Sequence, residues 1–226
     1  MPISAAIRRG LLFFALASFS SLGAQPAWFA GALGGAATLS ADAASQITSS
    51  TSAAALYKPE NGPALQLFGG VHFTDYISLE VNYVFNSNPV ALTELYNAAG
   101  TSSTYQDTRD SHQHSVSADL MIYFRKRTSR IRPYLALGAG LIRFRSKVDT
   151  LSTSPIPPPP PPPEITKTSA AVRFPVGIDI ALGHHWSLRY SFTETIRQNP
   201  LSAALTPPAP RHLAIYQNLV GFLKTF

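Results

Sequence analysis

The sequence predicts an all-β fold, an eight-stranded antiparallel up-and-down transmembrane β-barrel. Three observations lead to this prediction. Apolar and polar residues alternate with period two over long stretches, as in strands that have two different faces. The links between these stretches are alternately short and long. Only 13% of the residues are charged, against about 25% in soluble domains, yet no stretch after residue 24 has the ~20 apolar residues of a membrane helix.

The first residues of the chain predict export. The pair Arg8 and Arg9 precedes a short apolar run, LLFFALA, and small residues follow up to Gln25. This is the pattern of a Sec-type signal peptide, which is too short for a membrane anchor. We therefore expect residues 1–24 to be a cleaved signal peptide and residues 25–226 to be a barrel domain in the bacterial outer membrane.

Composition excludes several kinds of site. The chain has no cysteine, so it has no disulfide, no thiolate-bound metal and no lipid attached to a cysteine. Its formal charge of +6 falls to +4 without Arg8 and Arg9, and much of the excess lies between Arg125 and Arg132. This basic segment is not interleaved with aromatic residues, so we expect no nucleic-acid partner. Lipid headgroups rich in phosphate are the partners that we predict for it.

Four stretches alternate most regularly. Between Ile77 and Phe85 every odd position is apolar, whereas the even positions include Ser78, Glu80 and Asn82. A helix would mix these two sets, because its period is 3.6 residues. The same alternation recurs at residues 113–124, 172–182 and 186–197. Each stretch therefore predicts a strand with one apolar and one polar face.

Four further stretches predict strands with less regular faces. They span residues 28–41, 64–73, 133–147 and 212–226, and two of them are rich in glycine. Glycine weakens a strand, but inside a small barrel it leaves room for large neighbours. Pro175 is expected to face the interior, to remove one hydrogen bond from the ladder and to mark a β-bulge.

The links favour a membrane barrel over a β-sandwich or a soluble barrel. Short links are predicted at residues 74–76, 127–129 and 183–185, and long links at about 42–63, 87–111, 148–168 and 198–211. An even-stranded membrane barrel has this order, with short periplasmic turns and long extracellular loops. The apolar face is therefore expected to point outward. Aromatic residues lie near its strand ends, as in an aromatic girdle: Tyr76, Tyr83, Phe85, Trp186 and Tyr190.

The polar face then points into the barrel. An eight-stranded barrel is just wide enough for side chains to fill it, and buried charges need partners. We predict an interior polar network, with Gln66 and His72 beside it. Its charged members are Glu80, Asp119, Arg173, Asp179 and Arg189.

Three segments of these strands are distinctive: RPYLALGAG from Arg132, WSLRY from Trp186 and the ending LVGFLKTF. They resemble the small outer-membrane β-barrel family, of the OmpA/OmpX kind. The resemblance implies that a terminal Phe, preceded by a Gly and alternating apolar residues, is read by the barrel-insertion machinery. Gly221 and Phe226 match that pattern, whereas Lys224 replaces a usual apolar residue. We expect no periplasmic peptidoglycan-binding domain after the last strand.

Catalysis is the main alternative to a structural role, since some barrels of this family modify lipid A. His112, His114 and Ser115 are the candidate residues for a histidine/serine hydrolase. A nucleophile must contact its base, and these residues lie where a loop enters a strand. The two histidines also lack a third metal ligand. We therefore predict no enzyme activity, no cofactor and no metal.

The predicted function is that of an integral outer-membrane protein of structural or surface-interaction type, which presents mobile extracellular loops. The third loop contains seven prolines, Pro157–Pro163, which form a stiff polyproline segment. This run serves either as an extended arm or as tolerated low complexity. Outer-membrane lipid and an extracellular ligand of the loops are the expected partners of a monomer. A narrow pore is the remaining alternative.

Overall fold

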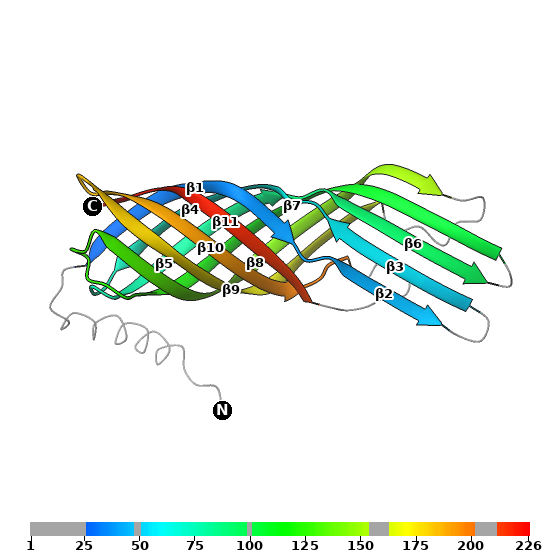
Figure 1. The fold of residues 1–226 in the computed structure, drawn as a ribbon, viewed down its shortest axis with the longest axis horizontal. Coiled ribbons are helices and arrows are strands. Elements are labelled where there is room, and N and C mark those ends of the chain that lie inside the picture. Colours follow the sequence, from blue (N-terminus) through cyan, green and yellow to red (C-terminus); the bar gives the residue numbers. More distant parts are fainter. Residues whose placement is uncertain (1–25, 48–50, 99–100, 154–162, 202–211) are drawn as a thin grey trace, which may run out of the picture.

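The computed structural model describes residues 26–47, 51–98, 101–153, 163–201 and 212–226. The predicted signal peptide, most of the proline run and most of the fourth loop lie outside these ranges. None of the described residues forms a helix that is long and apolar enough to cross a membrane. The described residues form eleven strands, and eight of them close a barrel (Figure 1).

The eight barrel strands form a closed antiparallel ring in the order β7-β5-β4-β1-β11-β10-β9-β8, which ends at β7 again. This confirms the predicted fold class. The strands are β1 (Ala27–Leu39), β4 (Gly62–His72), β5 (Ile77–Ser87), β7 (Thr101–Tyr123), β8 (Ile131–Thr153), β9 (Glu164–Gly183), β10 (Trp186–Gln198) and β11 (His212–Thr225). The first and last strands pair, with Leu33 opposite Gly221.

Three short connections lie at one end of the barrel, which we call the short-turn end. They join β4 to β5, β7 to β8 and β9 to β10, as the sequence predicts. The tightest is the two-residue turn His184-His185, where both residues have positive φ, 49° and 69°. Positive φ at both central residues is the geometry of a type I′ turn, which fits the twist of the flanking strands.

The opposite, long-link end differs from the prediction of four irregular loops. β2 (Asp42–Ile47), β3 (Thr51–Pro59) and β6 (Val90–Ala98) occupy most of the first two predicted loops. β6 pairs with the first half of β7, β3 pairs with β6, and β2 pairs with β3. Figure 1 shows these strands continuing the barrel wall beyond β1 and β11. We call β2, β3, β6 and the adjoining ends of β7 and β8 the extension.

The predicted faces are confirmed along the barrel strands. On β5, Ile77, Leu79 and Val81 are exposed on the outer wall, whereas Ser78, Glu80 and Asn82 are buried inside. The outer wall is therefore an apolar band. At the short-turn end it is bordered by exposed aromatic rings, which are Trp28, Tyr76, Phe124, Trp186 and Phe226.

Pro175 faces the interior, as predicted, but the predicted bulge is wrong. The ladder between β8 and β9 is interrupted opposite Phe174 and Pro175, and it resumes in the same register. A missing N–H removes a hydrogen bond without adding a residue, so the strand keeps its register. The register shift between β9 and β10 lies instead at Trp186/Ser187, next to the turn.

Candidate functional site

The charged residues that the sequence places inside the barrel meet around Arg189, in the half nearer the short-turn end. Its Nη1 donates to Glu80 Oε2 at 2.5 Å, and its Nε and Nη2 donate to the two carboxylate oxygens of Asp179 at 2.7 and 2.9 Å. Nη2 also donates to the Tyr123 hydroxyl at 2.9 Å. These groups come from β5, β7, β9 and β10, so a single arginine joins four strands of the ring.

Arg173 and Asp119 form a second group of ion-paired side chains directly beside the first. The Arg173 Nε lies 3.7 Å from Asp119 Oδ2, and its Nη1 donates to Ser117 Oγ at 2.8 Å. Asn82 donates to the same Asp119 oxygen at 3.0 Å. Because Asp119 pairs with Glu80 across β5 and β7, the two groups adjoin. The structure thus brings all five predicted charges into adjoining ion-paired groups, with Gln66 bonded to Asn82.

Small residues on the interior face make room for this network. An added Cβ at Gly138 would overlap the Asp119 carboxylate, and one at Gly70 would press into the Phe29 ring. Aromatic rings also surround Arg189, with its Cζ 4.7 Å from the centre of the Phe68 ring. Buried ions in such a setting depend on partners that are held in place. This arrangement suits a rigid, filled barrel.

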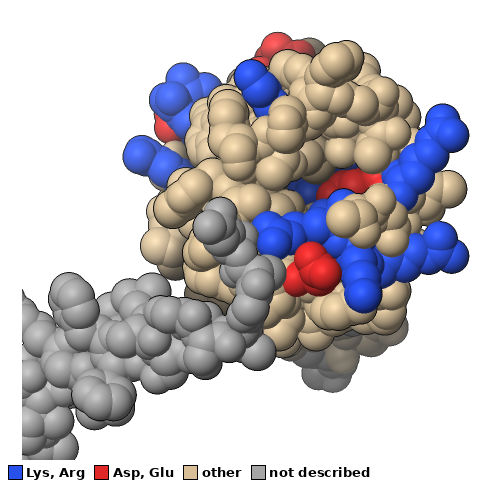
Figure 2. Space-filling model, turned by 90° about the vertical axis from the view of Figure 1, so that its left-hand side faces the viewer, with Lys and Arg blue, Asp and Glu red and all other residues tan. Residues whose placement is uncertain are grey.

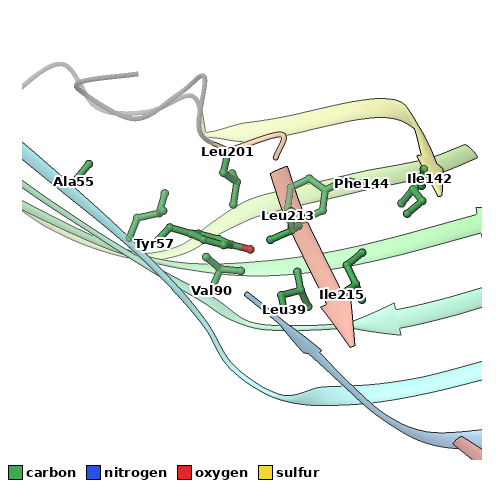
Figure 3. Packing of buried hydrophobic residues seen from close by; sticks show 11 residues of the cluster. Leu39, Ala55, Tyr57, Val90, Ile142, Phe144, Leu201, Leu213 and Ile215 are labelled. Atoms are coloured by element: carbon green, nitrogen blue, oxygen red, sulfur yellow. The ribbon is translucent and has the colours of Figure 1, made fainter. Parts of the chain in front are cut away.

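The half of the interior nearer the long-link end contains an apolar cluster, with buried polar residues such as Arg109 and Asp107 beside it. Side chains from the barrel strands and from β3 and β6 converge there and point toward one another (Figure 3). We call this group the upper cluster, and it consists of Leu39, Ala55, Tyr57, Val90, Leu92, Ile142, Phe144, Ala171, Leu201, Leu213 and Ile215. Because Leu201 follows β10, part of the fourth link covers the barrel interior. The upper cluster therefore fills the barrel at this end.

Two arginines in the half nearer the long-link end, which we call the upper half, were not predicted from the sequence. Arg197 is 2% exposed, and among the described residues its three nitrogens make no hydrogen bond. Its Cζ lies 5.0 Å from the centre of the Phe144 ring. Arg109 is fully buried and contacts Asp107 at 2.6 Å, within the second predicted loop. Arg197 continues the inward-facing positions Thr193 and Thr195 of β10, so period-two counting along that strand could have revealed it. Arg109 lies between Thr108 and Asp110, where the sequence shows no contrast between faces.

The candidate hydrolase residues lie on different faces of β7. His112 and His114 face outward, where His112 contacts Asp110 at 3.1 Å and the His114 Nδ1 shares a 2.8 Å hydrogen bond with the Tyr83 hydroxyl. Ser115 points to the opposite face, and its Oγ donates to the Val84 carbonyl at 3.4 Å. Since neighbouring residues of a strand alternate, no histidine–serine contact forms here. Across the described residues, no three His, Asp or Glu side chains gather as metal ligands.

The extension carries an apolar outer surface. Ile47 of β2 is 84% exposed and Leu95 of β6 is 49% exposed, with Leu56 between them on β3. A groove of about 410 Å³ lies on this face. The residues lining it are Ala43, Ser45, Ala54, Ala55, Leu56, Thr93 and Leu95. β2 forms one edge of the sheet, because its described pairing is with β3 alone.

The predicted assembly residues lie on the closing strand β11. An added Cβ at Gly221 would overlap the backbone of Ala32, so a glycine allows β11 to approach β1 closely. Phe226 is 69% exposed, and its backbone N–H donates to the Trp28 carbonyl at 2.8 Å. The Lys224 Nζ lies 5.2 Å from the centre of the Phe226 ring. The terminal ring thus stands on the outer surface at the short-turn end.

A closed ring of eight antiparallel strands, apolar outside and polar inside, defines an outer-membrane β-barrel. Residues 12–205 match the model of the outer membrane protein beta-barrel domain. The chain belongs to this family, which also agrees with the resemblance seen in the sequence. No curated protein matched the chain.

The chain is similar to several solved structures. Neisserial surface protein A is 16% identical, with a TM-score of 0.54 over 90% of this chain and 100% of that one. The N-terminal barrel of Pseudomonas aeruginosa OprF is 11% identical, with a TM-score of 0.44 over 89% and 100%. The attachment invasion locus protein of Yersinia pestis, in complex with the heparin analogue sucrose octasulfate, is 10% identical, with a TM-score of 0.47 over 88% and 99%. The likeness to the neisserial protein shows the fold of this chain as a small outer-membrane barrel.

Proposed function

We propose that this protein is a surface-interaction protein without catalysis, in which the barrel is an anchor and the long-link end is displayed outside the cell. The observation that carries this proposal is the extension. β7 and β8 run without interruption from the barrel wall into it, and they hold β6, β3 and β2 in a sheet. A groove on a sheet that continues a rigid barrel is held in place, unlike one on an irregular loop.

The apolar outer face of the extension supports an interaction role. Large exposed apolar patches on a protein mark contacts with proteins, ligands or membranes. Here Leu56 and Leu95 line a groove together with small side chains, and Ile47 is exposed on the edge strand β2. An extended segment of a partner can pair with such an edge through its backbone. The extracellular partner of this surface is therefore expected to contribute apolar side chains.

The filled interior supports an anchor over a narrow pore. The Arg189 ion pairs span the half of the interior nearer the short-turn end, which we call the lower half. The upper cluster packs across the other half. An eight-stranded barrel filled by side chains has no aqueous channel. We therefore expect the purified protein to give no single-channel current in planar bilayers. Regular current steps that vanish when the protein is omitted would contradict the anchor.

The separation of Ser115 from His112 and His114 supports the absence of hydrolase activity. Lipid A from cells that produce the protein should keep its mass. A new lipid A species on expression, lost in His114→Ala, would contradict this part of the proposal.

Cysteine labelling tests the display of the extension. The chain has no cysteine, so Ser45→Cys in β2 introduces a single exposed thiol. Thr128→Cys in the turn between β7 and β8 is the matched control at the other end. In intact cells, a maleimide that cannot cross membranes should label Ser45→Cys alone, and both variants should react after lysis. Labelling of Thr128→Cys alone in intact cells would show the opposite orientation and contradict the proposal.

We also propose that residues 1–24 are removed on export and that the mature barrel begins at Gln25. The barrel family and the apolar run after Arg9 support this. N-terminal sequencing of protein purified from outer membranes should read Gln-Pro-Ala-Trp. A sequence that begins at Met1 would contradict it.

A further inference from the structure

The short-turn end contains a cavity that the proposed function does not use. Its volume is about 220 Å³, below the 300–1,000 Å³ of most drug-sized ligand pockets. Residues from the turns and the strand ends line it, including His72, Arg127, Ser129, Arg132, Asp179 and His185. Figure 2 looks onto this end and shows Lys and Arg side chains gathered there, with one acidic group recessed between them and another beside them at the surface. The size of the cavity suits a small ligand.

The charge of Arg132 is not matched in this cavity. Its side chain is 8% exposed, and its Nη2 donates to the Asp75 backbone carbonyl at 3.1 Å. The Asp75 carboxylate pairs instead with Arg127, at 3.1 Å. Among the described residues Arg132 has no carboxylate within ion-pair distance, and its buried Nε has no hydrogen-bond partner. A buried donor without a partner is costly, so this nitrogen marks a place for an acceptor.

Asp179 does not supply that acceptor, although it lies opposite Arg132 across β8 and β9. Its Oδ1 accepts from Arg189, and its Oδ2 accepts from both Arg189 and Tyr123. The carboxylate charge is thus neutralised from inside the barrel. The residues outside the described ranges include no Asp or Glu, so they contribute no carboxylate side chain either.

A second polar side chain, His72, lines the same space. The Nδ1 of His72 shares a 2.6 Å hydrogen bond with Ser78 Oγ, which leaves Nε2 as the ring nitrogen for a ligand in the cavity. Arg132 is held in position because its Cζ lies 3.8 Å from the centre of the Tyr123 ring. A fixed guanidinium matches the geometry of a phosphate, and nearby cations raise the local anion concentration.

We propose that this cavity is a binding site for a phosphate group, with Arg132 as its main ligand. The exposed cations Arg125, Lys126 and Arg130 lie in the turn beside it and attract the anion. The basic segment of the sequence thereby acquires a specific role, in which one arginine binds and the others steer.

Titration of the folded full-length protein with inorganic phosphate tests the site. In maltoside micelles, which contain no phosphorus, ³¹P line broadening should saturate at one phosphate per chain. Arg132→Gln should weaken binding at least tenfold. Arg143→Gln removes the same charge from an exposed residue of β8, eleven residues beyond Arg132 and outside the cavity, and it should change binding less than twofold. Heat-modifiable gel migration checks that each variant is folded.

A second variant keeps the test valid if Arg132→Gln does not fold. Ser129→Trp fills the cavity from the turn without removing any charge, and it should abolish saturable binding.

Repeating the titration in phospholipid nanodiscs separates the two sources of phosphate. Equal binding in micelles and nanodiscs identifies a free phosphate compound as the ligand, whereas loss in nanodiscs identifies a lipid headgroup. No saturable binding in micelles, or equal binding by the wild type and a folded Arg132→Gln or Ser129→Trp variant, would overturn the proposal.

Discussion

The two halves of the barrel interior each contain a buried arginine of β10, and these two arginines have different surroundings. Arg189, in the lower half, binds two carboxylates and a tyrosine hydroxyl. Arg197, eight residues further along β10, faces the upper cluster, and its side chain makes no hydrogen bond among the described residues. The comparison shows that burial of a charged side chain does not by itself determine whether that side chain joins neighbouring strands. In the lower half the ion pairs of Arg189 join the strands beside a second apolar cluster, whereas the upper cluster packs against Arg197 without an ion pair to it among the described residues.

The largest expected effect comes from breaking the lower half. Arg189→Met would leave Glu80 and Asp179 buried without their cation, which typically costs about 3–5 kcal/mol. Urea-induced unfolding in lipid vesicles, followed by the fluorescence of Trp28 and Trp186, measures this loss. The triple variant that also carries Glu80→Gln and Asp179→Asn is the control, and it should recover part of the stability. No loss in Arg189→Met would remove the distinction between the halves.

A similar or slightly smaller effect should follow from a change in the upper half. Leu213 is 1% exposed within the upper cluster. Leu213→Ala should lower the unfolding free energy by about 2–5 kcal/mol, because it leaves a cavity in packed apolar surroundings. Val220→Ala, on the exposed outer face of the same strand, is the control in the same unfolding assay. Equal losses in both variants would show that the upper cluster is not a packed core.

Arg197→Met sharpens the comparison most directly, because it repeats the first substitution eight residues away. Removing a buried charge that has no carboxylate partner among the described residues should leave the unfolding free energy within about 1 kcal/mol of the wild type, or raise it. The methionine keeps most of the apolar contact with Phe144. A loss as large as that of Arg189→Met would mean that Arg197 has a partner that binds it strongly.

The smallest effect concerns an exposed ion pair beyond the barrel wall. The hydrogen bond from Arg145 Nε at 2.7 Å, together with the charges of Arg145 and Lys147, lowers the pKa of Glu164. Its small contribution to stability is therefore present above the ordinary glutamate pKa and is lost as pH falls through the lowered value. In a ¹³C NMR titration, Arg145→Gln should raise the midpoint of the Glu164 carboxyl group. An unchanged midpoint would exclude this pair.

The barrel and the extension also differ in how far they could be predicted from the sequence. Strand count and face assignment followed from alternation, since Glu80 and Asp179 sit between apolar neighbours. The extension was not predicted, because β2, β3 and the first part of β7 are rich in Ser, Thr and Ala and show no contrast between faces. Their strand structure depends on pairing with β6 and β8, which local sequence does not encode.

The sequence by itself determined the barrel: its period-two alternation and the alternation of short and long links admit few other folds. It also determined which charges face inward, because a strand has only two faces. The tertiary structure alone decided the partners. Arg189 meets Glu80 across the lumen, Arg132 is left without a carboxylate, and Arg197 faces Phe144, because strand register and barrel closure set which side chains come within reach.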